Sequence, residues 1–228
     1  ETPAFGINLA DPNDELREAN LDRICRRLER AEKLGSRCCV GHGGTPNTPK
    51  MWQHNPDNFS QANIDRCVDG IQRILDAVQP QRTKFVLETE SRILPDSAEV
   101  YLQIIEAVDR PGFGVHLDPV NIISSPRRFY YSGAFIRDCF QKLGPYIASC
   151  HAKDSQMVPG KQVHFEEVPP GDGDMDYATY LTELVGLGRD VPLLFEHFPE
   201  EDQNRAREYV YQQAAALGIR VRNSEHKR

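Results

Sequence analysis

Short apolar runs and long amphipathic stretches alternate along the chain, and this alternation limits the fold more than any other feature of the sequence. The short runs have the length and composition of buried strands. They lie at Ala4–Leu9, Arg37–His42, Lys84–Glu88, Gly114–Asp118, Ile147–His151 and Pro192–Glu196. The stretches between them repeat apolar residues at helical spacing, as helices that cover a sheet do. These helices are expected at Asp14–Leu34, Ser60–Val78, from just after Pro95 to Val108, and at Gly133–Leu143, Met175–Leu187 and Glu201–Leu217.

The order strand, helix, strand, helix, without hairpin signals, predicts a parallel sheet covered by helices. Each unit has the length of a βα unit of a TIM barrel, which closes with eight such units. We therefore expect an α/β fold, a TIM (β/α)8 barrel that lacks its first two βα units, roughly 60 residues, in this chain. Residues 1–222 should form this single domain, and residues 223–228 a polar C-terminal tail.

Composition narrows the choice of partners. The formal net charge is -7, so the chain has no basic footprint for nucleic acid. No apolar run approaches the roughly 18 residues that a membrane span needs, and the first residues do not resemble a signal peptide. The six cysteines fall mostly in apolar segments without a disulfide framework, as core thiols of a cytoplasmic enzyme do. We expect a cytoplasmic protein, and a homo-oligomer is left open.

The last four predicted strands each end in a side chain that can bind a metal ion. These side chains are Glu88, Asp118, His151 and Glu196. Strand side chains alternate between faces, and Glu88 and Glu196 fall on the inward face, pointing to the rim where barrel active sites lie. The first and fourth tips should be roughly 12–13 Å apart at Cα, a gap that two Glu side chains and one ion can span. The alternative is that each residue merely caps its strand or pairs with a Lys or Arg.

Three carboxylates and one imidazole form a mostly hard ligand set. Such a set suits one divalent ion, Mn²⁺ first, with Mg²⁺ or Co²⁺ as alternatives, better than a structural zinc. Glu90 is a rival to Glu88 but lies beyond the strand tip. His116 shares the inward face with Asp118 one layer deeper, where a core role or contact with a ligand is expected.

Further candidates could contact a substrate. His42 ends a strand and is either a substrate contact or a core histidine. Lys153 could bind a substrate oxygen, or pair with Asp154 or a rim carboxylate. Arg127 lies in a loop where it could meet an anionic group, although solvated arginines are common. The segment Ser155–Pro170 is either a lid over the rim or an ordinary surface loop.

Several motifs, taken in order, resemble those of the sugar phosphate isomerase/epimerase, or xylose isomerase-like, TIM barrels from about Phe5 to Leu217. They are Asn8-Leu9-Ala10-Asp11-Pro12, Val40-Gly41-His42-Gly43-Gly44, Leu87-Glu88, Leu117-Asp118-Pro119-Val120-Asn121, Cys150-His151-Ala152-Lys153-Asp154, Gly171-Asp172-Gly173-Asp174-Met175-Asp176-Tyr177 and Leu194-Phe195-Glu196.

The resemblance to the ketose 3-epimerase branch implies roles for the strand-end residues. Glu88, Asp118, His151 and Glu196 would hold the metal, and Glu88 and Glu196 would also transfer protons on opposite faces of the substrate. That branch commonly has a histidine three residues after the aspartate. Here the position is Asn121, a candidate substrate contact whose identity puts the exact epimerase reaction in question.

These features favour a metal-dependent isomerase or epimerase that moves a proton of a small sugar or related polyol through an enediolate. Two alternatives stay open: a lyase or dehydratase on the same scaffold, and a non-catalytic barrel subunit. Abasic-site endonucleases share the fold, but their DNA groove should be basic and their metal site richer in histidine. The net charge of -7 speaks against that function.

Overall fold

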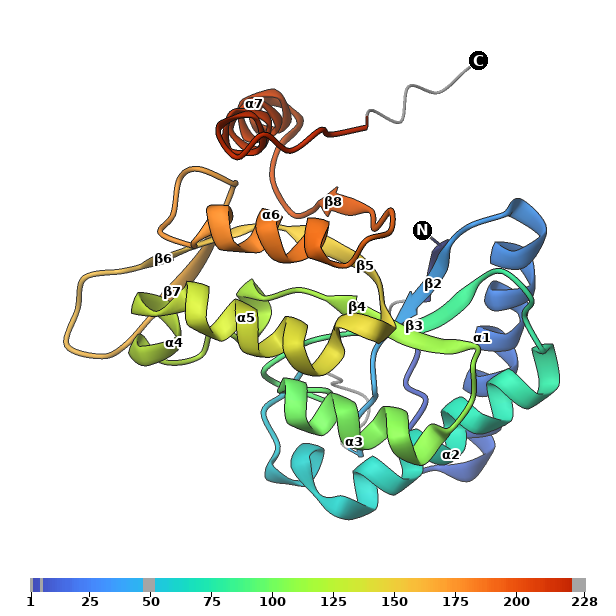
Figure 1. Cartoon of the computed structure of the whole chain (residues 1–228). Coiled ribbons are helices and arrows are strands. Elements are labelled where there is room, and N and C mark those ends of the chain that lie inside the picture. Colours follow the sequence, from blue (N-terminus) through green and yellow to red (C-terminus); the bar gives the residue numbers. More distant parts are fainter. Residues whose placement is uncertain (1, 5, 47–51, 223–228) are drawn as a thin grey trace.

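The computed structural model describes residues 2–4, 6–46 and 52–222, and in these residues a parallel sheet carries helices on its outer side (Figure 1). The six strands of this sheet follow the order β1-β2-β3-β4-β5-β8, and every neighbouring pair is parallel. They are β1 (Thr2–Pro3), β2 (Cys38–Gly41), β3 (Lys84–Glu88), β4 (Phe113–Leu117), β5 (Ile147–Ala152) and β8 (Leu193–Phe195). The predicted fold is confirmed: the sheet is a partial TIM barrel of six parallel strands.

The first strand is displaced from its predicted position. We expected it at Ala4–Leu9, but β1 comprises Thr2 and Pro3, and among the described residues of this segment only Ala4 continues the ladder, its amide donating to the Val40 carbonyl. Gly6 then adopts a φ of 70°, which turns the backbone out of the extended conformation. Beyond it, the Asn8 side chain accepts the amides of Ala10 and Thr45 in a loop.

A β-hairpin occupies most of Ser155–Pro170, the segment for which the sequence left a lid over the rim and an ordinary surface loop open. Strands β6 (Asp154–Met157) and β7 (Phe165–Val168) pair antiparallel, so the expectation of a chain without hairpins was wrong here. Phe165 packs on Phe129, with ring centroids 5.4 Å apart, which fixes the hairpin against the short helix α4 (Pro126–Tyr130). The hairpin could not be predicted because β7 lacks a clear apolar alternation and its two central residues, Glu166 and Glu167, are exposed.

The helices follow the predicted order and pack side by side around the outside of the sheet (Figure 1). They are α1 (Asp14–Leu34), α2 (Gln61–Val78), α3 (Ala98–Val108), α4 (Pro126–Tyr130), α5 (Ser132–Leu143), α6 (Tyr177–Gly186) and α7 (Glu200–Ala216), with 3₁₀ turns at Pro56–Phe59, Val120–Ile122 and Gly144–Tyr146. Helix α6 starts after Met175 because the Asp176 side chain accepts the Thr179 amide as its cap. None of the helices in the described ranges is long and apolar enough to cross a membrane.

Alternation along the strands divides the core into two parts. Val40 and Val86 meet Cys38 on the inner face of the sheet. The side chains between them, such as Phe85 and Leu87, join the larger core under the helices. The alternation of strand side chains between the two faces is as predicted. Glu88 lies two residues after Val86, on the same inner face, so this face ends in a polar side chain at the tip of β3.

Tyr101 of α3 ties this helix to two strands. Its buried hydroxyl accepts the Leu87 amide at 2.9 Å and lies 2.7 Å from the Leu87 carbonyl and 2.9 Å from the Gly114 carbonyl. The contact anchors the strand that ends in Glu88.

Tyr101→Phe should therefore lower the free energy of unfolding by about 1–3 kcal/mol, since it leaves buried backbone groups without their partner. Urea denaturation followed by circular dichroism measures the change. Tyr130→Phe is the matched control, because Tyr130 is 66% exposed and its hydroxyl should contribute within about 0.5 kcal/mol. Equal stability of the two variants would contradict the anchoring role.

Candidate metal centre

Four side chains meet where strands β3, β4, β5 and β8 end. Glu88 is the last residue of β3, Asp118 and Glu196 directly follow β4 and β8, and His151 lies one residue before the end of β5. Parallel strands end at the same edge of a sheet, so these neighbouring strands deliver all four side chains to one place. One candidate ligand atom from each residue lies within 4.8 Å of the others. The structure thus brings together the four residues that the sequence predicted as metal ligands.

The carboxylates surround a single nitrogen of His151. His151 Nδ1 lies 3.0 Å from Glu88 Oε1, 3.3 Å from Asp118 Oδ2 and 3.3 Å from Glu196 Oε2. Glu88, Asp118 and His151 are buried, and Glu196 is 20% exposed at its side chain. We call these four side chains the rim cage.

This geometry fits a cation better than a hydrogen-bond network. Nδ1 carries at most one proton, so it cannot donate well to three oxygens at once. Adjacent ligands on an octahedral ion with bonds near 2.1 Å lie roughly 3 Å apart, close to the observed separations. Three hard carboxylates and an imidazole are also a donor set that Mg²⁺ and Mn²⁺ accept. The residues present therefore fit a divalent ion.

The charges within the rim cage depend on one another. Burial by itself raises the pKa of Glu88, but hydrogen bonds from His151 and His42 outweigh it, so the pKa falls well below its usual value. Burial lowers the pKa of His151, but Asp118 and Glu88 more than offset this and raise it to about 10. Glu88 is thus held ionised beside a positive charge, which a bound cation would replace.

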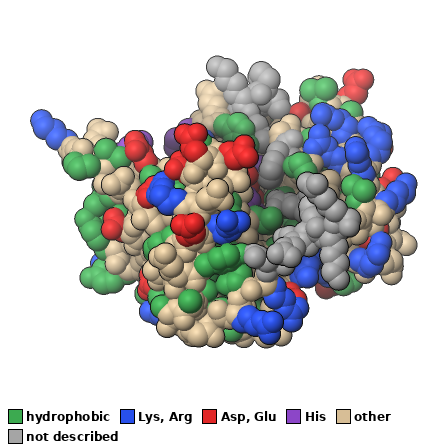
Figure 2. Space-filling view, turned by 90° about the horizontal axis from the view of Figure 1, so that it is seen from above, with side chains coloured by type: hydrophobic (Ala, Val, Ile, Leu, Met, Phe, Trp, Pro, Cys, Tyr) green, Lys and Arg blue, Asp and Glu red, His purple; other side chains and the backbone are tan. Residues whose placement is uncertain are grey.

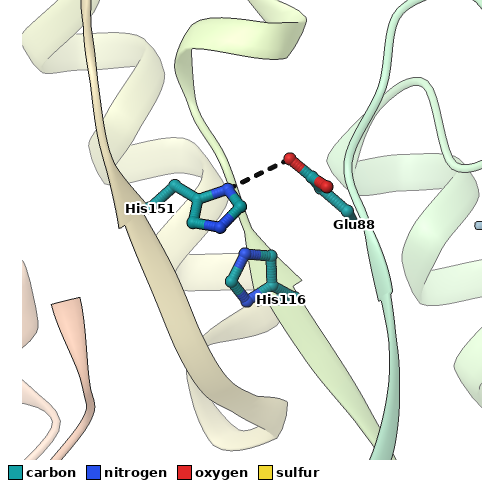
Figure 3. A group of neighbouring side chains, drawn as sticks. All are labelled: Glu88, His116 and His151. Carbon is teal, nitrogen blue, oxygen red and sulfur yellow. Dashed lines mark hydrogen bonds and ion pairs between the residues drawn. The ribbon is translucent and has the colours of Figure 1, made fainter. Parts of the chain in front are cut away.

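His116 lies beneath the rim cage, as Figure 3 shows for Glu88, His116 and His151 on their three strands. Its ring is fully buried, 4.0 Å from the His151 ring centroid, and its Nδ1 lies 2.6 Å from Ser149 Oγ. Its Nε2 has no hydrogen-bond partner in the described part of the chain. Burial lowers the pKa of His116 to about 3, so a neutral ring packs against His151 from the deeper layer.

Two more predicted residues hold Glu88 in place. Asn121 Nδ2 donates to Glu88 Oε1 at 2.9 Å, and the Asn121 amide donates to Asp118 Oδ1 at 3.2 Å. On the other side, His42 Nε2 lies 3.5 Å from Glu88 Oε2 while the His42 ring contacts Trp52 edge-on. Together with His151, whose Nδ1 lies 3.0 Å from Glu88 Oε1, these residues position Glu88 from three different segments.

Lys153 points into the rim cage. Its ammonium lies 2.8 Å from Glu196 Oε2 and 2.9 Å from Asp118 Oδ2. Of the partners weighed from the sequence, the rim carboxylates are the ones observed. Asp154 instead accepts backbone amides, including those of Gly171 and Met175.

The remaining candidates lie elsewhere. Glu90 pairs with Arg92 at 2.8 Å and is not part of the rim cage, and Arg127 is exposed on α4. Two residues near the rim cage were missed from the sequence. Glu167 of β7 lies 3.2 Å from Lys153 Nζ, and His197 lies 3.5 Å from Glu196. The sequence signal for His197 was its place directly after Glu196, whereas Glu167 is brought in by the unpredicted hairpin.

The chain is similar to a known protein family and to several solved structures. Residues 2–218 match the family model described as "Xylose isomerase-like TIM barrel". No curated protein matches the chain. Among solved structures, a xylose isomerase domain protein from Planctomyces limnophilus is 25% identical with a TM-score of 0.68, over 93% of this chain and 70% of that one.

Two other solved structures are similar in fold. A xylose isomerase-like TIM barrel protein from Mycobacterium smegmatis, in complex with magnesium, is 17% identical with a TM-score of 0.71, over 93% of this chain and 70% of that one. A D-tagatose 3-epimerase-like protein is 20% identical with a TM-score of 0.72, over 93% of this chain and 74% of that one. Further neighbours include D-psicose 3-epimerases, an endonuclease IV and a probable dehydratase. On the match of its residues 2–218, the chain belongs to the xylose isomerase-like TIM barrel family.

Proposed function

We propose that this protein is a divalent-metal-dependent isomerase or epimerase that moves a proton of a small sugar or related polyol through an enediolate. The observation that carries the proposal is the meeting of three carboxylates around His151 Nδ1 at the strand ends. Residues at the carboxyl ends of barrel strands are where this fold places its chemistry.

Glu88, Asp118, His151 and Glu196 would hold the ion. Mn²⁺ is our first choice, with Mg²⁺ or Co²⁺ as alternatives, because the donor set is mostly oxygen. A magnesium complex of a similar fold supports a hard ion. When bound, the ion would supply a Lewis acid that polarises a substrate carbonyl next to a hydroxyl.

Glu88 and Glu196 would transfer the proton. They come from β3 and β8, the two outer strands of the four that form the rim cage, so they can face a substrate from different sides. One glutamate, as the carboxylate, would remove the proton next to the carbonyl, and the other, as the protonated carboxylic acid, would donate its proton to the opposite face, so that the two exchange protonation states in each turnover. Asn121, His42 and His151 hold Glu88 in a single orientation, which favours its use as a positioned base.

The substrate contacts are proposed from position. His42, Asn121 and Lys153 border the rim cage and offer polar atoms that could bind hydroxyl or carbonyl oxygens. Arg127, exposed on α4, would contact only a substrate that extends beyond the rim. The face seen in Figure 2 carries acidic as well as basic side chains, and the formal net charge of -7 favours a small substrate over a DNA backbone.

A dehydratase is the second candidate, because Asn121 puts the exact epimerase reaction in question. Asn121 stands where the ketose 3-epimerases commonly have a histidine. A probable 3-DHS dehydratase from Bacillus anthracis shares the fold, with 21% identity and a TM-score of 0.64 over 96% of this chain. Removal of the same proton would then be followed by loss of a substituent. NMR in D₂O separates the two reactions, since an epimerase exchanges deuterium at one carbon while a dehydratase forms a new alkene signal.

Metal binding is the first test. The purified protein, stripped with a chelator, should bind about one Mn²⁺ or Mg²⁺ per chain by calorimetry, and Asp118→Asn should weaken binding by at least about 10-fold. Glu90→Gln is the matched control, because Glu90 is a buried carboxylate at the same edge that pairs with Arg92 instead. Equal loss in both variants would show that the rim cage is not the site.

The roles of the residues are the second test. Glu88→Gln and Glu196→Gln should lower kcat by about 10²–10⁴-fold at saturating metal, because an amide offers an oxygen but cannot accept and return a proton. Asp118→Asn and His151→Asn should lose activity mainly through metal affinity, so excess metal should partly restore them. Rescue of the Glu variants but not of Asp118→Asn would mean that base and ligand are exchanged. Near-normal activity in all four would favour the non-catalytic subunit.

A further inference from the structure

Lys153 is a fully buried lysine whose backbone is held rigidly. It lies between the end of β5 and the start of β6, and the Tyr177 hydroxyl donates to its carbonyl at 2.8 Å. The next residue, Asp154, accepts the amides of Gly171 and Met175. Because the backbone is fixed, the ammonium of Lys153 can move only by rotation of its side chain. A buried ammonium needs partners of opposite charge wherever it lies.

The ammonium contacts the oxygens that converge on His151. Lys153 Nζ lies 2.9 Å from Asp118 Oδ2, 2.8 Å from Glu196 Oε2 and 3.9 Å from Glu88 Oε1. These are the same three atoms that lie within 3.3 Å of His151 Nδ1. An ion held by the rim cage would therefore share at least two ligand atoms with the ammonium, and the two positive charges would repel each other.

We propose that Lys153 is a tethered internal cation that compensates the rim cage without metal and competes with the metal ion for Asp118 and Glu196. This inference rests on the proposed metal site and goes beyond it, because it assigns the strength of metal binding to a residue that is not a ligand. Lys153 Nζ and Glu196 Oε2, 2.8 Å apart, form an ion pair that a divalent cation of higher charge can replace.

The structure also offers a place for the displaced ammonium. Glu167 Oε2 on β7 lies 3.2 Å from Lys153 Nζ, on the side of the hairpin, and is 30% exposed at its side chain. His197 Nδ1 lies 3.3 Å from Nζ and 3.1 Å from Glu167 Oε1, and so belongs to the same group. A small rotation of the Lys153 side chain toward Glu167 would keep its charge paired while it leaves Asp118 and Glu196. Metal occupancy is thereby linked to the β6–β7 hairpin.

Lys153→Met tests the competition, since methionine keeps most of the side-chain volume and removes the charge. Calorimetry with MnCl₂ on the metal-stripped protein should show binding at least about 10-fold tighter than in wild type. The metal-free variant should also melt at a lower temperature, because its carboxylates repel each other without compensation. Lys161→Met is the matched control, as Lys161 is exposed in the hairpin loop and its removal should change affinity by less than about twofold.

Glu167→Gln separates local competition from a general effect of charge. This variant removes the carboxylate that would pair with the displaced Lys153 ammonium. Metal binding should therefore weaken by several-fold when Lys153 is present and change little in the Lys153→Met background. Equal effects in both backgrounds, or unchanged or weaker Mn²⁺ binding in Lys153→Met, would overturn the proposal. If Lys153→Met does not fold, Lys153→Gln, which also removes the charge, replaces it in the same measurements once its circular dichroism spectrum matches that of the wild type.

The competition between Lys153 and the metal ion can be tested separately from the proposed function. Metal affinity and melting temperature require no turnover, so the competition can hold in a protein that is not an epimerase. If wild type and Lys153→Met both fail to bind Mn²⁺, the rim cage is not a metal site and the competition is wrong with it. If both bind equally, the metal site stands and only the competition falls.

Discussion

The convergence of three carboxylates, two of them buried and the third 20% exposed, is the constraint on which the rest of the site depends. Glu88 and Asp118 lose hydration through burial, and the three carboxylates repel each other, so the arrangement is stable only with positive charge among them. His151 and Lys153 supply that charge within the chain. The fold provides the rigidity, since each carboxylate is attached at or directly after a strand whose position its neighbours fix. The same electrostatic demand makes the rim cage a strong candidate for a divalent ion.

Parallel strands explain why so much of this could be predicted from the sequence. Six apolar runs with helices between them indicate a barrel-like sheet, and parallel strands end at a common edge. Because Glu88, Asp118, His151 and Glu196 each stand at such an end, their convergence follows from topology without knowledge of any side-chain contact. Glu90 could be set aside by the same reasoning, as it lies beyond the strand tip and pairs with Arg92.

The features that could not be predicted depend on irregular backbone and on long side chains. Gly6 ends the first strand early through a positive φ, which an apolar run does not signal. The hairpin that brings Glu167 to Lys153 has an exposed strand without alternation. Lys153 has four flexible bonds, so its choice between Asp154, the rim carboxylates and solvent depends on packing that a sequence pattern does not contain.

The most direct measurement is a crystal structure of the protein grown with MnCl₂, with data collected on both sides of the manganese absorption edge. The account predicts one anomalous peak, within about 2.0–2.3 Å of one atom each of Glu88, Asp118, His151 and Glu196, the range of metal–oxygen and metal–nitrogen bonds. A well-ordered rim cage without a peak at millimolar Mn²⁺, or a peak held by other residues, would contradict it.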